Sequence, residues 1–272
     1  MNLRTDLVEE RRTALKCEVA GTKAKEKSIG DCRLLEVDIE TPEAAEKLSK
    51  GRGKYFTLTF PKLDTLNDTA DIEKAIVYAL RILLPEICGN VMVVGLGNAD
   101  ITPDALGPLA ANRILATRHL KNDIKERLGL NEIKSVSVLI PGVLGKTGME
   151  ASLTVSATAK ASSTSAIIVI DALAAAEKGR LCTTIQLTDS GIAPGSGVKN
   201  SRKELNRKSL GIPVIAIGMP TVVDANDSSE NTLMVTPKEI DLLIKIASEI
   251  IARALNRFLQ PDLSEDIIDA LS

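Results

Sequence analysis

The stretch that decides the fold is Ile167-Ile168-Val169-Ile170-Asp171-Ala172-Leu173, a run of branched apolar residues that meets a carboxylate. Comparable apolar runs lie at 91–94, 135–140, 183–187 and 214–217. Runs this continuous indicate strands covered on both faces, as in a parallel sheet between helices. We therefore predict an α/β fold of phosphorylase- or hydrolase-like type, with a mostly parallel central sheet and helices on both faces.

The N-terminal part of the chain predicts a smaller addition to this sheet. Segments 32–39 and 55–60 alternate apolar and polar residues, which is typical of half-buried strands. The first thirty residues are highly charged and show little periodicity. We expect a charged arm at 1–30 and a single α/β domain at 31–272, with its core at 91–260 and a small N-terminal β-containing appendage.

Two long helices are also expected. Segment 72–84 repeats apolar residues at helical spacing and is ended by Pro85. A C-terminal helix is predicted to begin with Thr236 as N-cap, Pro237 at the first helical position and Glu239 completing a capping box.

Composition narrows the function. The 272 residues include 34 Lys and Arg against 36 Asp and Glu, without the basic excess of a nucleic-acid binder or a polybasic membrane protein. No stretch approaches the roughly 18 uncharged apolar residues of a spanning helix. Four cysteines without a CxxC spacing indicate reduced thiols. We expect a cytoplasmic location, with no direct nucleic-acid partner and no membrane association.

The single histidine, His119, limits the available chemistry. One histidine removes most multi-histidine zinc sites and leaves any Ser-His or Cys-His catalysis resting on that residue. Its polar surroundings, near the expected end of a helix, predict a surface position. We therefore expect neither a metal nor another cofactor.

A glycine-rich loop follows the strand at 91–94. Gly95 and Gly97 suggest a dinucleotide site, but Asp100 replaces the third glycine and would repel a pyrophosphate. A non-enzymatic nucleotide-binding module stays an alternative. Further along, Asp104 follows Thr102 and Pro103, so it is either a first-turn carboxylate stabilised by a helix dipole or a functional group at the carboxyl edge of the sheet.

Asp171 is the second acidic candidate. It ends the apolar run quoted above, so it is either a cap for the following turn or a site carboxylate at the same edge. If the two strands are neighbours, Asp104 and Asp171 face each other across one cleft. Two close carboxylates share a proton, which leaves one to activate water. That arrangement suits amide hydrolysis without histidine or cysteine.

A third loop, 188–200, carries tentative substrate-binding residues. Asp189 begins an Asp-Ser-Gly sequence, and the glycines that follow either let a substrate backbone approach closely or form a turn. The basic residues after them are either a solvated helix face or a site for an acidic substrate side chain. The tentative set is Asp189, Gly195, Ser196, Lys199 and Arg202, with Lys203 beside it.

Several blocks together resemble the germination proteases of spore-forming bacteria. The resemblance spans residues 91 to 241 in order, and the N-terminal Arg4-Thr5-Asp6-Leu7 adds to it. The blocks are 93–98, 102–108, 141–143, 147–150, 170–175, 189–192, 194–198, 210–218, 220–225 and 234–241.

The resemblance implies an endopeptidase that degrades small acid-soluble spore proteins at germination, in the spore core. It implies an atypical aspartic mechanism with Asp104 and Asp171 as catalytic residues, and a fold related to hydrogenase-maturation proteases. The family forms homotetramers and is made as a zymogen that processes itself. Its substrates are cut after an acidic and before a large apolar residue. The arm therefore includes a propeptide, with cleavage expected between Asp6 and Leu7; the alternative is a frayed terminus.

Two departures from the family pattern affect the groove and the subunit contacts. Residues 226–233 directly bridge two blocks that an extra segment separates in longer relatives, and Ala176 and Glu177 stand where an arginine is common. In the related maturation proteases an acidic pair binds a metal together with a histidine. A metal-dependent maturation protease is thus the alternative among the hydrolases, but His119 lies in the wrong segment for that ligand.

Overall fold

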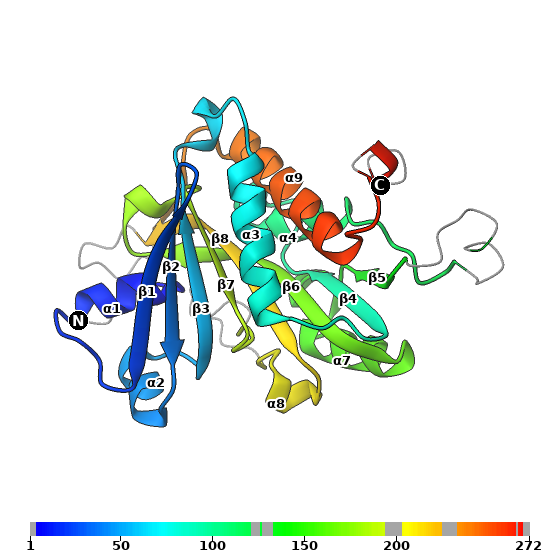
Figure 1. The fold of residues 1–272 in the computed structure, drawn as a ribbon, viewed down its shortest axis with the longest axis horizontal. Helices are drawn as coiled ribbons and strands as arrows, with labels where there is room; N and C mark the ends of the chain where they lie inside the picture. Colours follow the sequence, from blue (N-terminus) through cyan, green and yellow to red (C-terminus); the bar gives the residue numbers. More distant parts are fainter. Residues whose placement is uncertain are drawn as a thin grey trace.

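A computed structural model describes residues 4–120, 126, 133–193, 203–224, 233–264 and 266–268. Helices and strands are interspersed along the chain, as Figure 1 shows. The strands are β1 (Thr22–Ile29), β2 (Cys32–Ile39), β3 (Gly53–Thr59), β4 (Asn90–Gly95), β5 (Ser135–Leu139), β6 (Thr164–Ala175), β7 (Thr184–Thr188), β8 (Val214–Asp224) and β9 (Met234–Val235). The α-helices are α1 (Val8–Ala14), α2 (Pro42–Leu48), α3 (Ala70–Leu83), α4 (Leu106–Ala111), α6 (Leu144–Thr147), α7 (Ala151–Ala161), α8 (Arg207–Leu210) and α9 (Ile240–Leu259), and the 3₁₀ helices are η1 (Leu63–Thr65), η2 (Thr102–Asp104) and η3 (Lys178–Arg180).

One continuous sheet organises the described residues, in the order β1-β2-β3-β7-β8-β6-β4-β5, with β9 paired to β8. The pairs β8–β6, β6–β4 and β4–β5 are parallel. In the other half of the sheet, the pairs β1–β2, β2–β3, β3–β7 and β7–β8 are antiparallel. The α/β class is confirmed, but the expectation of a mostly parallel sheet is wrong because β7 enters antiparallel and joins the N-terminal strands to the parallel half.

Strand β1 lies in the segment expected to be an arm without regular structure. Its sequence, Thr-Lys-Ala-Lys-Glu-Lys-Ser-Ile, presents charged side chains to solvent along most of its length. It pairs with β2 only, at the edge of the sheet. An edge strand rich in lysine resists pairing with other chains, and because it buries no apolar face it shows no alternating hydrophobic pattern.

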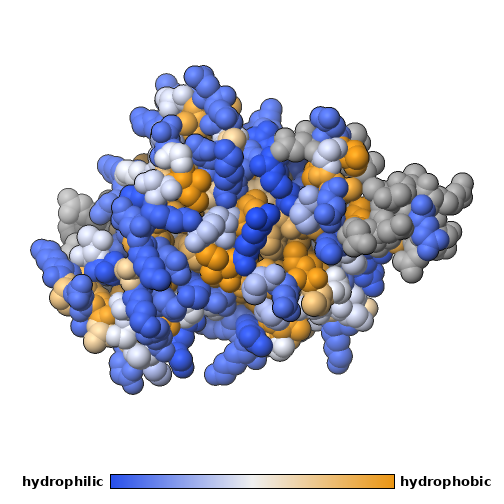
Figure 2. Space-filling view, viewed as in Figure 1, coloured by the Kyte–Doolittle hydropathy of each residue, from blue (hydrophilic) through white to orange (hydrophobic). Residues whose placement is uncertain are grey.

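The largest core lies between one face of the sheet and helices α3, α4 and α9. Ile76, Leu80, Ile168, Ile244 and Ile251 are among its fully buried members. Helix α3 begins two residues before the predicted start and ends beside Pro85, as expected. Figure 2 shows the outer surface on this side as mainly hydrophilic, with smaller hydrophobic patches.

Two smaller clusters cover the opposite face at its two ends. Helix α7 packs Val155 against Met92 and Val169 of β4 and β6. Helices α1 and α2 pack Val8 and Leu48 against β2 and β3. The strands between these two covers, β7 and β8, therefore carry less helical packing on this side.

The start of α9 differs from the sequence prediction. The helix begins at Ile240 with Glu239 as N-cap, and no side chain caps it. Thr236 Oγ1 instead donates a hydrogen bond to the Thr221 carbonyl oxygen at 2.9 Å. The predicted capping box is wrong because β9 pairs with β8 and brings the Thr236 hydroxyl to that strand.

Within the described part of the chain, no helix is long and apolar enough to cross a bilayer. The four cysteines, Cys17, Cys32, Cys88 and Cys182, are free.

Candidate active site

A pocket of about 1040 Å³ lies over the middle strands, and residues from both halves of the sheet line it. Ala216 and Gly218 of β8 contribute little side-chain bulk there. They lie on the face opposite the large core, since their neighbours Ile215 and Ile217 belong to that core. The pocket therefore lies between α7 on one side and α1 and α2 on the other, above the small residues of β8.

The register places two polar side chains on either side of Gly218. Gln186 of β7 pairs with Gly218, and Gly218 pairs with Asp171 of β6. Residues in one row across a sheet point to the same face, and two strand spacings separate the outer Cα atoms by about 10 Å. A Cβ on Gly218 would lie 2.5 Å from Leu173 Cγ, so the Leu173 side chain lies over this glycine. Gln186 and Asp171 thus stand on the same face, with Gly218 between them.

Asp171 is buried within strand β6 and is only 7% exposed. Its Oδ1 accepts a hydrogen bond from the Ala172 amide at 2.9 Å. Strand β6 continues through Asp171 to Ala175, so the predicted strand end at this residue is wrong, and so is the capping alternative. The strand continues because β8 remains its partner up to Val223.

Asp104 reaches the pocket from η2. Its Oδ2 accepts the Asn98 amide at 2.8 Å. Asp104 lies in the first turn of η2, as one of the two alternatives predicted; the N-cap of this 3₁₀ helix is Ile101, and α4 starts two residues after Asp104. Asp104 and Asp171 line the same pocket, and the structure thereby brings together the two carboxylates that the sequence paired.

The glycine-rich turn positions Asp104. Gly97 has a φ of +115°, and a Cβ on it would lie 2.0 Å from the Asp104 carbonyl oxygen. A Cβ on Gly95 would meet the Gly107 carbonyl oxygen at 2.4 Å. These glycines allow close packing of the chain around η2 and α4, which accounts for them without a bound phosphate.

The N-terminal segment enters the same pocket. The Asp6 amide donates to the Ala174 carbonyl at 2.8 Å, and Asp6 Oδ2 accepts the Ala174 amide at 2.9 Å. Leu7 has no exposed surface and packs with Leu173, Ala175 and Val223. The acidic and apolar residues of the expected cleavage site therefore occupy a polar and an apolar part of the site, respectively.

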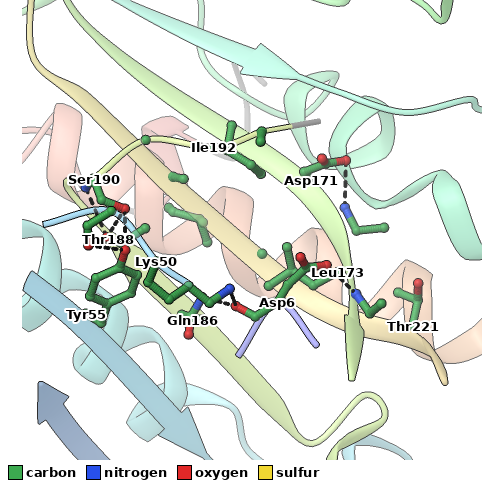
Figure 3. A pocket seen from close by; sticks show the side chains of 18 of the residues that line it. Asp6, Lys50, Tyr55, Asp171, Leu173, Gln186, Thr188, Ser190, Ile192 and Thr221 are labelled. Atoms are coloured by element: carbon green, nitrogen blue, oxygen red, sulfur yellow. Dashed lines mark hydrogen bonds between the residues drawn. The ribbon is translucent and has the colours of Figure 1, made fainter. Parts of the chain in front are cut away.

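Two donors converge on the carbonyl oxygen of the Asp6–Leu7 peptide bond. Lys50 Nζ lies 2.7 Å from this oxygen and Gln186 Nε2 lies 2.8 Å from it. Figure 3 shows Lys50, Gln186 and Asp6 together, with Asp171 on a nearby strand. Burial lowers the pKa of Lys50 to about 8. Sequence reasoning missed both donors, because no motif marks a lysine after α2 or a glutamine inside a strand.

Contacts on both sides hold this segment in place. Glu10 accepts the amides of Ala176 and Glu177, each at 2.9 Å, and the hydroxyl of Thr5. Arg4 pairs with Asp224. The frayed-terminus alternative is therefore wrong for residues from Arg4 onward, although the division of the chain at residue 30 stays a prediction.

The third loop contributes Ser190 rather than Asp189 to this pocket. Asp189 Oδ1 accepts the Lys54 amide at 2.7 Å, and burial raises the pKa of Asp189. Asp189 lines an adjacent pocket. Ser190 lines the main pocket and accepts a hydrogen bond from the Tyr55 hydroxyl at 2.8 Å.

Gly195, Ser196, Lys199 and Arg202 lie outside the described residues. Lys203 is exposed and does not line the main pocket.

The donor set does not fit a metal site of the maturation-protease kind. Among the described residues, no group of three or more His, Cys, Asp and Glu side chains could hold a metal ion. His119 lies in a turn and is not among the residues that line the pocket. We therefore derive no step through a metal.

Two carboxylates that line one pocket on an α/β sheet, beside a segment of the chain itself, suit the hydrolysis of a peptide bond. Comparison with known proteins agrees. A family model described as germination protease matches residues 3–233, and the chain belongs to this family. It is an endopeptidase of spore germination.

Individual relatives support the assignment over most of the chain. The chain is 36% identical to the germination protease of Caldanaerobacter subterraneus subsp. tengcongensis, over 100% of this chain and 98% of the relative. It is 36% identical to that of Clostridium acetobutylicum, over 96% of each. It is 40% identical to that of Priestia megaterium, over 90% of this chain and 68% of the relative.

Proposed function

We propose that this protein initiates the degradation of small acid-soluble spore proteins in the spore core, the cytoplasm of the spore, during germination. It cleaves after an acidic and before a large apolar residue, using Asp104 and Asp171. It is made as a zymogen that cuts its own Asp6–Leu7 bond. It assembles as a homotetramer and needs no metal or other cofactor.

The observation that carries this proposal is that Asp6 lines the same pocket as Asp104 and Asp171, while the adjacent Leu7 is buried against Leu173, which also lines that pocket. Leu7 is completely buried among aliphatic side chains, which favours a large apolar residue after the cleaved bond. The Asp6 carboxylate accepts a backbone amide, which favours an acidic residue before it.

The reaction requires that one of the two carboxylates, Asp104 or Asp171, is ionised and that the other is protonated. One carboxylate takes a proton from water as the water oxygen bonds to the Asp6 carbonyl carbon. The protonated partner supplies a proton to the Leu7 nitrogen, the C–N bond breaks, and the products are a carboxylic acid and an amine. The net change is the addition of one water, and the proton passes from one carboxylate to the other.

The test is conversion of the purified full-length chain at mildly acidic pH. Intact mass and N-terminal sequencing should reveal a product beginning at Leu7. Asp104→Asn and Asp171→Asn should each stop this conversion and the cleavage of an added small acid-soluble spore protein, with the fold retained by circular dichroism. Asp64→Asn, an exposed carboxylate in η1, is the matched control. Conversion by either site variant at the wild-type rate would refute the assignment.

The assembly and the location need their own measurements. Light scattering during gel filtration should give about four times the chain mass. A fluorescent fusion should lie inside the spore core. A monomer that cleaves substrate at full rate contradicts the tetramer, and a coat location contradicts the assigned compartment.

A further inference from the structure

The carbonyl oxygen of the Asp6–Leu7 bond accepts hydrogen bonds from two side chains. Lys50 Nζ and Gln186 Nε2 approach it at 2.7 and 2.8 Å. These distances match those of donors that stabilise an oxyanion during acyl transfer. The same peptide bond is the one whose cleavage is proposed above.

The orientation of Gln186 is set by a second contact. Gln186 Oε1 accepts the Val8 amide at 2.7 Å, so its Nε2 is the atom that faces the Asp6 carbonyl. Exchange of the two ends of this amide would place an acceptor against an acceptor. Gln186 therefore forms hydrogen bonds with the chain on both sides of Leu7, to the Asp6 carbonyl oxygen and to the Val8 amide.

Lys50 supplies a charged donor from a different element. It follows α2, whose last residue Leu48 packs in the α1/α2 cluster, and its chain reaches over the pocket to the Asp6 oxygen. A charge-assisted donor is roughly twice as strong as a neutral one. Charge that develops on the carbonyl oxygen would strengthen both bonds, and the lysine bond most.

We propose that Lys50 and Gln186 are catalytic residues that polarise the scissile carbonyl and stabilise the oxyanion formed on attack. As water adds to the carbonyl carbon, the electron pair of the C=O double bond moves onto the oxygen held by these two donors. The pair returns to re-form C=O as the C–N bond breaks. The inference rests on the proposed self-processing and assigns the electrophilic half of the site, opposite the carboxylates.

The test compares self-processing in Lys50→Met and Gln186→Glu full-length proteins. Gln186→Glu keeps an acceptor for the Val8 amide and removes the donor to the Asp6 oxygen. Loss of one oxyanion donor typically slows acyl transfer by about 100- to 1,000-fold, and we expect that loss in each variant. Lys50→Arg should recover part of the rate. Lys47→Met, an exposed position on α2, should convert at the wild-type rate.

Hydrogen exchange separates catalysis from docking. If the pair stabilises the oxyanion, the amides of Leu7 and Val8 stay as protected as in Asp171→Asn protein while conversion slows. If the pair only holds the arm, protection falls in step with rate, and the proposal is wrong. Conversion of both variants at the wild-type rate, with Asp171→Asn inert, overturns this inference alone. Conversion by Asp171→Asn at the wild-type rate instead overturns the proposed function.

Discussion

Gly97→Ala tests whether the glycine-rich turn exists to place Asp104. The added Cβ would lie 2.0 Å from the Asp104 carbonyl oxygen, and the residue would have to keep a φ of +115°. Overpacking costs about 1–3 kcal/mol and a strained positive φ about 1–3 kcal/mol. We expect destabilisation of about 2–6 kcal/mol and, at roughly 2–4 °C per kcal/mol, a Tm lowered by roughly 4–24 °C.

The variant should lose activity beyond its loss of stability. The backbone relieves the clash by moving away from residue 97, and this carries the Asp104 carboxylate with it. A misplacement of about 1 Å in a catalytic group can slow a reaction by about 100-fold. Thermal unfolding and self-processing should be measured side by side, well below the lowered Tm.

Gly145→Ala is the matched control. No atom lies within 4 Å of a Cβ built on Gly145, so its stability and conversion should stay near those of the wild type. If Gly97→Ala keeps the wild-type Tm and the wild-type conversion rate, the interpretation that this turn positions Asp104 is wrong.

Three further outcomes are expected. Lys50→Met should be more stable than the wild type by roughly 3 kcal/mol near neutral pH, with the gain vanishing as pH rises from about 8 towards 10.5; calorimetry across that range checks it. Burial lowers the pKa of Lys50 and Arg11 lowers it further, whereas Asp6 and Glu10 raise it; because the net pKa lies below its usual value, keeping the ammonium charged in the folded protein costs stability below about pH 8. Asp189→Asn should slow proteolysis less than either site variant; equal loss would place the third loop at the centre of catalysis. Activity should survive exhaustive chelation, and recovery of a lost activity by a divalent ion would contradict this.

Local patterns predicted the elements whose burial is regular. Unbroken apolar runs identified β4, β6 and β8 because strands covered on both faces need apolar side chains at every position. The edge strand β1 was not predicted from such a pattern, because its side chains are mostly exposed to solvent. The capping box predicted at Thr236 does not form because the Thr236 hydroxyl makes a tertiary hydrogen bond to Thr221 instead.

The sequence alone determined the α/β class, the candidate carboxylates Asp104 and Asp171 and, through family resemblance, the kind of reaction. These features depend on periodicity and on contiguous blocks of residues. Only the tertiary structure decided the mixed direction of the sheet and the burial of Leu7, and it alone placed Lys50 and Gln186 on one carbonyl oxygen. Lys50 and Gln186 are 136 positions apart in the printed numbering and are joined by the antiparallel pairing of β3 with β7 and the entry of the N-terminal segment. Such a meeting depends on strand order and register across the whole sheet, which no local pattern encodes.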